Sequence, residues 1–157
     1  MFRKDGDVRV VINGAGIGGL TLAQALRGCA EVIVVERDAE AIATGGYRLA
    51  INGAATAVLA SHLDSGLMAR IRAVSDGTER FARFTIATDR MRPLIVEELD
   101  AGEDRLLAQR RALRLLLTSG LEDRIRWSTR VTRVEQLDRS AAVHLHTGEA
   151  LKADLGW

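Results

Sequence analysis

The N-terminal pattern of apolar and polar residues predicts a strand, a glycine turn, a helix and a second strand. Residues 8–12 form a mostly β-branched run between a charged leader and a group of glycines, as in a strand buried on both faces of a parallel sheet. Residues 18–27 repeat apolar side chains at helical spacing, and Gly28 stands where a helix would stop. Residues 31–35 form a second apolar run. Together these elements predict a βαβ unit with a right-handed crossover.

The middle of the chain predicts shorter and more varied elements. Residues 37–46 have the composition of a loop, and residues 47–51 predict a short strand. Small residues over 53–61 predict a helix that continues loosely over 67–74. Alternating sequence before residues 89–93 and an apolar run after them predict a β-hairpin.

The last part of the chain predicts one helix and then a series of short strands. Leucines flank or line a helix near residues 110–119, which ends at Gly120. Residues 125–154 read as short strands with turns at 138–140 and 147–148. The whole pattern is that of an α/β protein in which the N-terminal βαβ unit is followed by a mixed or antiparallel sheet.

Length and composition predict one domain over residues 1–157. A chain of this length has room for one hydrophobic core and is short for two. A formal net charge of +1 and the lack of a lysine-rich block argue against a nucleic-acid partner. The sequence has no run typical of a signal peptide and no apolar stretch long enough for a membrane span. We therefore expect a soluble, cytoplasmic protein with no membrane partner.

The potential ligand residues predict neither a disulfide nor a metal site. Cys29 is the only cysteine, so no disulfide can form within the chain. His62, His144 and His146 have no metal-ligand spacing with carboxylates, and the last two alternate in a predicted strand. We expect those two histidines to lie on one solvated face.

Three glycines after the first predicted strand match the pattern G-x-G-x-x-G. Gly14 permits a tight turn, Gly16 lets the backbone approach a pyrophosphate, and Gly19 lets the helix pack close to the strand. Backbone N–H groups at the start of the helix, including those of Ile17 and Gly18, are expected to bind a diphosphate.

The acidic residue Glu36 adds weight to this fingerprint. It lies 17 residues after Gly19, at the end of the second predicted strand, where a carboxylate can accept hydrogen bonds from ribose hydroxyls. The same carboxylate would repel a 2′-phosphate. A turn that is merely rich in glycine is the alternative, but strand, spacing, helix and acid all agree with the fingerprint. The fingerprint itself does not distinguish NAD from FAD.

The chain resembles the FAD-dependent monooxygenases of the aromatic-hydroxylase type, the family of para-hydroxybenzoate hydroxylase. The resemblance rests on segments VVINGAGIGGLTLAQAL, VIVVER, GGYRLAIN, AQRRALRLLL, STRVTRVE and HTGEALKADL. It implies a Rossmann-like βαβ FAD-binding domain with an additional mixed or antiparallel sheet, the glutathione-reductase type of flavoprotein fold. It also implies that FAD occupies the glycine turn and that NAD(P)H serves as co-substrate in the complete enzyme.

The same resemblance implies four cofactor contacts besides the glycines and Glu36. Arg37 would lie along the adenine, although a charge at a strand end is also commonly just solvated. Arg48 would reach the flavin side of the pocket, and Arg110 would contact the ribityl and diphosphate region. Backbone groups of Val131 would recognise the adenine edge.

Only one of two adjacent arginines can face such a cofactor. Arg110 and Arg111 point apart on the predicted helix. The R-x-x-L spacing of the family selects Arg110, with Leu113 as the apolar partner.

The chain is expected to be incomplete at its C-terminus relative to this family. In the family, the strand matching ALKADL leads to an aspartate–glycine motif that touches flavin and NADPH, whereas this sequence ends at ADLGW. A later glycine–aspartate motif and most of the substrate sheet also lie beyond that point in the family. The resemblance implies no catalytic acid or base within these residues.

The leading interpretation is the FAD-binding portion of a flavin-dependent monooxygenase that uses NAD(P)H and O₂ on an aromatic or polyketide-type small molecule. An inactive flavin-binding remnant, able to self-associate through an open sheet edge, is the main alternative. An NAD-dependent dehydrogenase is disfavoured, because the only tyrosine, Tyr47, has Ile51 and not lysine four residues later.

Overall fold

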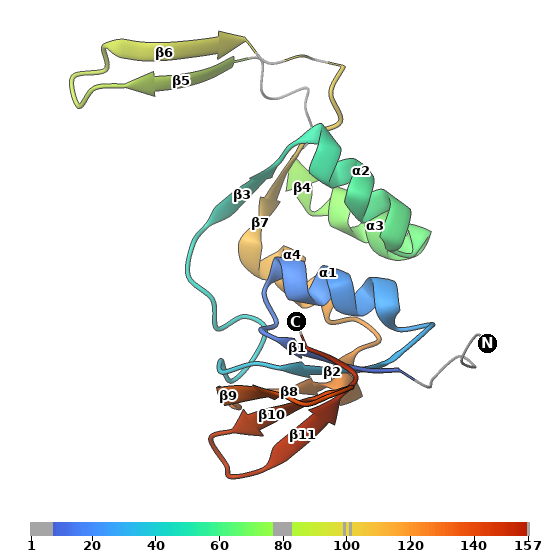
Figure 1. Ribbon diagram of the computed structural model, residues 1–157. Coiled ribbons are helices and arrows are strands. Elements are labelled where there is room, and N and C mark those ends of the chain that lie inside the picture. Colours follow the sequence, from blue (N-terminus) through green and yellow to red (C-terminus); the bar gives the residue numbers. More distant parts are fainter. Residues whose placement is uncertain (1–7, 77–82, 99, 101, 157) are drawn as a thin grey trace. The chain divides into compact units, whose positions relative to one another are not determined.

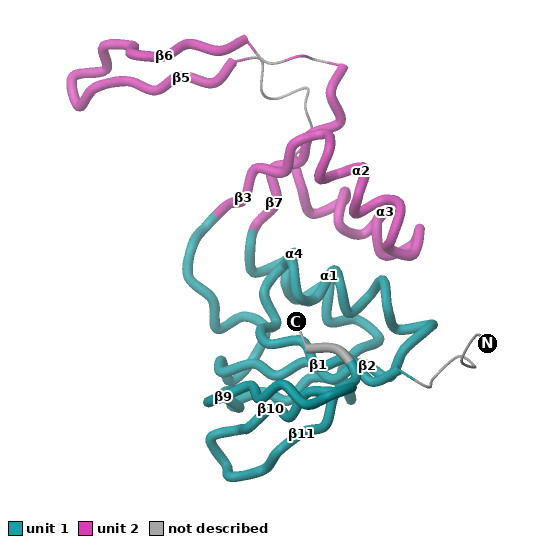
Figure 2. Tube along the Cα trace, in the orientation of Figure 1, with its two compact units in different colours: residues 1–47, 110–157 teal, residues 48–109 magenta. Residues whose placement is uncertain are grey.

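The computed structural model of the chain describes residues 8–76, 83–98, 100 and 102–156. It divides into two compact units, one formed by residues 1–47 and 110–157 and the other by residues 48–109 (Figure 2). The second unit is thus an insertion in the sequence of the first. The expectation of one domain over residues 1–157 stays a prediction.

The first unit contains the predicted βαβ element (Figure 1). Strands β1 (Arg9–Asn13) and β2 (Glu31–Val35) are parallel and are joined by helix α1 (Ile17–Leu26). Two short strands from later in the chain, β8 (Ile125–Arg126) and β12 (Leu155–Gly156), complete a parallel sheet in the order β12-β1-β2-β8. The apolar runs predicted strands at nearly these bounds, whereas the two outer strands join the sheet from far along the chain.

Helix α1 packs close to the first strand because Gly19 has no side chain. A Cβ atom on Gly19 would overlap the carbonyl oxygen of Gly14 and lie 3.2 Å from Cγ2 of Ile12. Gly14 itself has a φ of 116°, a conformation that L side chains rarely adopt. The turn and the close helix contact therefore both require glycine.

Helix α4 (Arg110–Leu117) packs against α1 within the first unit. Leu113 and Leu117 are fully buried on its inner face. Buried Gln24 of α1 donates hydrogen bonds of 2.8 Å to the carbonyl oxygens of Leu117 and Ser119. These bonds satisfy carbonyl groups at the last residue of α4 and just after it.

An antiparallel sheet supports the other face of the parallel sheet. Its strands are β9 (Val131–Gln136), β10 (Ala141–Leu145) and β11 (Ala150–Ala153), in the order β11-β10-β9. A short 3-10 turn, η2 (Glu122–Arg124), precedes β8. One apolar cluster joins the two sheets and contains Val11, Val35, Val143, Leu145, Leu151 and Ala153. Alternate burial along β10 follows from the two-residue period of a strand with one covered face.

The second unit has its own small antiparallel sheet. Strand β7 (Leu106–Gln109) lies between β3 (Arg48–Ile51) and β4 (Ser75–Asp76). Leu106 is buried in β7 and does not line the following helix. The leucine-rich sequence before residue 110 therefore spans a strand and a helix.

Two separate helices occupy the region predicted as one loosely continued helix. Helix α2 (Gly53–His62) and helix α3 (Ser65–Ala73) are divided by Asp64, whose carboxylate accepts the N–H groups of Gly66 and Leu67. An aspartate in this position caps a new helix, which explains the break.

The second unit also contains the predicted hairpin, which lies between β4 and β7 in the sequence. Strands β5 (Arg83–Ala87) and β6 (Pro93–Glu98) pair antiparallel, and Met91 in the turn between them has a φ of 58°. Apolar residues are exposed on it, including Phe84 and Ile95. Self-association through an open edge stays a prediction. Among the described residues, no helix combines the length and apolarity that a bilayer crossing needs.

Two adjacent glycines of α1 offer a matched test of the close helix contact. Gly19→Ala places a Cβ against the Gly14 carbonyl, so we expect the free energy of unfolding to fall by about 1–3 kcal/mol. Gly18→Ala meets no atom within 4 Å and should leave stability unchanged or raise it by up to about 1 kcal/mol. Urea unfolding of both variants measures the difference. Equal effects would show that the contact does not constrain the helix.

Candidate functional site

A pocket of about 590 Å³ lies in the first unit, at the carboxyl ends of β1 and β2. This edge of a parallel sheet is where α/β proteins commonly bind ligands. Seven of the ten residues predicted to bind the cofactor line it: Gly14, Gly16, Ile17, Glu36, Arg37, Arg110 and Val131. The structure therefore brings together residues from the two ends of the sequence.

Three predicted residues lie outside the lining of this pocket. Gly18 and Gly19 belong to α1, where Gly19 serves the close helix contact. Arg48 begins β3 in the second unit and forms an ion pair with Asp76. The cofactor roles given to these three residues stay predictions.

The glycine turn leaves an open space before helix α1. The N–H of Gly14 donates to the carbonyl oxygen of Val35, 2.8 Å away, which holds the turn to the end of β2. Gly16 precedes the helix in an extended conformation, and a Cβ there would meet no protein atom within 4 Å. A side chain at Gly16 would therefore enter the space at the helix N-terminus, where backbone N–H groups favour an anion. The turn fits a bound diphosphate.

Glu36 is a buried carboxylate with backbone partners. It is 7% exposed, and its Oε2 atom accepts the N–H of Ala15 at 2.7 Å. Its Oε1 atom accepts the N–H of Asp38 at 2.9 Å. The side chain thus links the glycine turn to the residues that follow β2.

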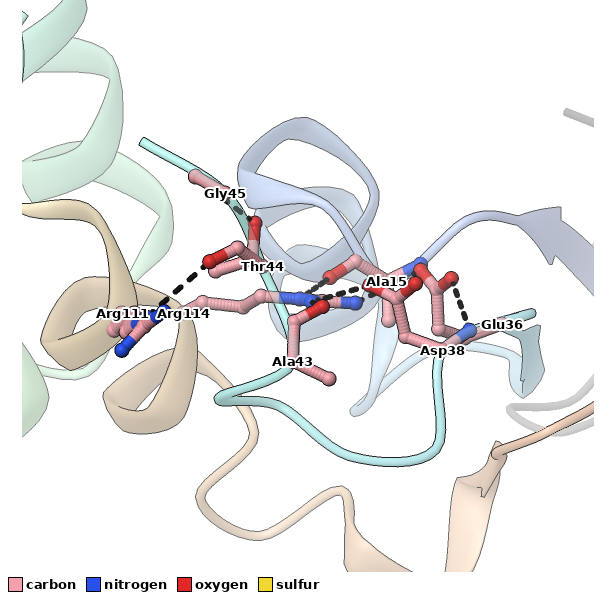
Figure 3. Close-up of polar contacts among 8 residues, drawn as sticks. All are labelled: Ala15, Glu36, Asp38, Ala43, Thr44, Gly45, Arg111 and Arg114. Carbon is pink, nitrogen blue, oxygen red and sulfur yellow. Dashed lines mark hydrogen bonds and ion pairs between the residues drawn. The ribbon is translucent and has the colours of Figure 1, made fainter. Parts of the chain in front are cut away.

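Arg114 is the central residue of the site that the sequence analysis missed (Figure 3). It is 3% exposed, and its Nη2 atom lies 3.0 Å from Oε2 of Glu36. Its Nε donates to the carbonyl oxygen of Ala15 at 2.7 Å, and its Nη1 donates to Oδ2 of Asp38 at 2.8 Å. The guanidinium carbon is 5.5 Å from the ring centroid of Trp127, within cation–π range. One side chain of α4 therefore joins the glycine turn to the end of β2.

The spacing of α4 contained a signal for this residue. Arg114 follows Arg110 by four positions, so the two side chains lie on the same face of the helix. This four-residue spacing was the signal in the sequence that placed Arg114 on the same side of the helix as Arg110.

Arg110 and Arg111 contact the loop that follows β2 in different ways. Arg110 lines the pocket, and its Nη1 atom would lie 3.2 Å from a Cβ on Gly46. Arg111 donates from Nε to the carbonyl oxygen of Thr44 at 3.2 Å (Figure 3). The position of Arg110 agrees with the R-x-x-L expectation, and its contact with a cofactor stays a prediction.

The segment before β9 closes another side of the pocket. The N–H of Thr129 donates to the carbonyl oxygen of Glu36 at 2.8 Å, and the N–H of Ser128 donates to the carbonyl oxygen of Asp38 at 2.8 Å. These bonds set Arg130 and Val131 in the pocket lining. Four arginines and two carboxylates then face or border the pocket, an excess of positive charge that favours an anionic ligand.

A family model and a set of solved structures match this chain. A family model described as an FAD binding domain matches residues 7–153. No curated protein sequence matches the chain.

Solved structures share the fold over nearly the whole chain. A protein assigned as an FAD-containing monooxygenase from Photorhabdus luminescens subsp. laumondii is 28% identical, with a TM-score of 0.76 over 96% of this chain and 39% of that one. FqzB is 24% identical, with a TM-score of 0.79 over 98% of this chain and 36% of that one. Klebsiella pneumoniae HpxO, complexed with FAD and uric acid, is 21% identical, with a TM-score of 0.73 over 97% of this chain and 39% of that one. This chain spans less than two-fifths of each of these proteins.

Arg114 should matter to folding as well as to the site. Arg114→Ala leaves Glu36 buried without its charged partner, so we expect the free energy of unfolding to fall by about 3–5 kcal/mol. Arg111 lies three residues earlier in the same helix and is exposed, so Arg111→Ala should lower the free energy of unfolding by less than about 1 kcal/mol. Denaturant unfolding of both variants provides the comparison. Similar small losses would mean that the buried ion pair contributes little.

Proposed function

Because this chain belongs to the FAD binding domain family, we propose that the pocket at its glycine turn binds the adenosine diphosphate half of FAD. The observation that carries the proposal is that one pocket is lined by Gly14 and Gly16, by Glu36 and by Arg110. These residues supply a backbone cradle for the diphosphate, an acceptor for ribose hydroxyls and a cation. Val131 and Arg37, which also line the pocket, are proposed to border the adenine.

The whole protein is proposed to be a flavin-dependent monooxygenase that acts on an aromatic or polyketide-type small molecule. The bound flavin would supply redox chemistry with NAD(P)H and O₂. The residues of this chain bind and orient: α1 presents N–H groups to the diphosphate, and Arg110 adds positive charge beside it. HpxO is complexed with FAD and uric acid, an example of a small ring compound bound by a protein of this fold. We also propose that the whole protein is cytoplasmic.

The first experiment compares FAD with NAD on the purified chain. FAD at one hundred times its dissociation constant should stabilise the folded chain by about 2.7 kcal/mol, seen as a raised melting temperature and a yellow protein. NAD should have a smaller effect at the same concentration. Gly16→Val should weaken FAD binding at least about ten-fold, because the side chain enters the diphosphate space.

Gly28→Val is the control, since a Cβ at Gly28 also meets no atom within 4 Å but lies beyond the other end of α1. Tight NAD binding without FAD binding would refute the proposed cofactor. Equal FAD affinity in the Gly16 variant and the parent chain would refute the proposed place of the diphosphate.

The two neighbouring arginines at the start of α4 separate a cofactor contact from a surface charge. A charge-assisted hydrogen bond is worth about 1.5–3 kcal/mol, so Arg110→Ala should lower FAD affinity about ten- to hundred-fold. The melting temperature of the cofactor-free chain should hardly change, because Arg110 is exposed. Arg111→Ala should have the smaller effect on affinity. A larger loss at Arg111 would reverse the assignment.

A further inference from the structure

We propose that Arg114 is a positioning residue for the adenosine ribose, acting through Glu36 and the glycine turn. The proposal rests on the proposed function, because it concerns the same pocket. Arg114 comes from α4, whereas Glu36 directly follows β2 and Ala15 lies within the glycine turn. Figure 3 shows the three meeting at one guanidinium.

Both polar backbone groups of Ala15 are held by this pair. The Ala15 N–H donates to Oε2 of Glu36 at 2.7 Å, and the Ala15 carbonyl accepts from Nε of Arg114 at 2.7 Å. The peptide units on either side of Ala15 therefore have a set orientation. The next residue is Gly16, which begins the diphosphate cradle. A shift of Arg114 would turn the Ala15 carbonyl and the cradle together.

The same contacts decide which oxygen of Glu36 can receive a ribose hydroxyl. A carboxylate oxygen accepts about two hydrogen bonds. Oε2 already has the Ala15 N–H and the Arg114 guanidinium, whereas the described contact of Oε1 is a single bond from the Asp38 N–H. Oε1 thus retains acceptor capacity in a residue that lines the pocket. Arg114 holds Glu36 in the rotamer that leaves Oε1 for the ligand.

The guanidinium itself has little left to offer a ligand. Nε bonds to Ala15, Nη1 bonds to Asp38 and lies 3.5 Å from the Ala43 carbonyl oxygen, and Nη2 pairs with Glu36. Four of the five N–H donors of an arginine are used in this way. This separates Arg114, which acts through other groups, from Arg110, which is proposed to contact the cofactor.

Charge balance gives Arg114 a second effect on the same ligand. Glu36 and Asp38 bring two carboxylates to a pocket that is proposed to take a diphosphate. The buried guanidinium pairs with both, at 3.0 Å and 2.8 Å. It therefore lets a ribose acceptor stay ionised close to an anionic ligand.

The test compares adenosine diphosphate with its 2′,3′-dideoxy analogue, which lacks the ribose hydroxyls. The parent chain should prefer the diphosphate with hydroxyls by about ten-fold or more. Arg114→Lys keeps the charge but cannot reach three acceptors in one plane, so the preference should shrink to less than about three-fold. A merely structural role would weaken both ligands equally and leave the ratio unchanged, which would overturn the inference. Calorimetry measures both affinities.

Arg133→Lys is the matched control, because Arg133 pairs with Glu135 on exposed β9 with a side chain that is 62% exposed. The ratio of the two affinities, for adenosine diphosphate and for its dideoxy analogue, should be the same in Arg133→Lys as in the parent chain. A ratio that falls equally in this control would overturn the assignment to Arg114. A parent chain that binds neither ligand would refute the proposed function and this inference together.

A second pair of variants tests the inference even if Arg114→Lys does not fold. Glu36→Met and the double variant Glu36→Met with Arg114→Met remove first one and then both members of the buried pair, and replacement of both by apolar side chains of similar volume is commonly tolerated. If Arg114 acts through Glu36, the two variants have the same preference ratio. A further loss of preference in the double variant would show a direct contact between Arg114 and the ribose, and would overturn the inference.

Discussion

The buried contact between Arg114 and Glu36 is the interaction on which the architecture of the first unit most depends. It joins a residue of α4 to the end of β2 and, through Ala15, to the glycine turn that lies 99 residues earlier in the chain. A charged pair with so little solvent access is tolerated only when its remaining donors and acceptors are satisfied. The backbone groups of Ala15 and Asp38 meet that requirement.

This arrangement explains how a discontinuous unit can form one binding pocket. The sequence leaves the first unit after residue 47 and returns to it at residue 110, directly at the start of α4. Gln24 and the buried leucines fix the helix against α1, and Arg114 fixes it against the turn. The inserted unit has its own sheet and helices, and the described residues that line the pocket all belong to the first unit.

The family match confirms the resemblance that the sequence motifs indicated, including an FAD-binding domain with a mixed α/β fold. In the proposed site, backbone N–H groups at the helix N-terminus, and not catalytic side chains, would do most of the binding. A Cβ on Gly16 would meet no protein atom within 4 Å, and the buried Glu36 carboxylate accepts backbone N–H groups of Ala15 and Asp38. The substrate and the oxygen-transfer step belong to the proposals, because the chain spans less than two-fifths of the structures that it matches.

The sequence by itself determined the local elements of the βαβ unit and the motif residues, because these depend on short-range patterns. Apolar runs predicted β1 and β2, and the spacing of Gly14, Gly16 and Glu36 predicted one binding turn. The pairing of strands that lie far apart in the sequence could not be predicted from such patterns. The place of β12 beside β1 and the break at Asp64 emerged only from the structure.

Arg114 shows the same division most clearly. Arg114 stands in a leucine-rich helix that holds two other arginines, and its four-residue spacing from Arg110 indicates a shared helix face but not whether the side chain is buried. Its burial and its proposed positioning role depend on acceptors from Ala15, Glu36 and Asp38, which approach it only when α4 docks on α1. The sequence therefore specified which groups could bind a nucleotide, while tertiary packing decided which of them are buried, paired and oriented, because those properties arise from contacts between distant segments.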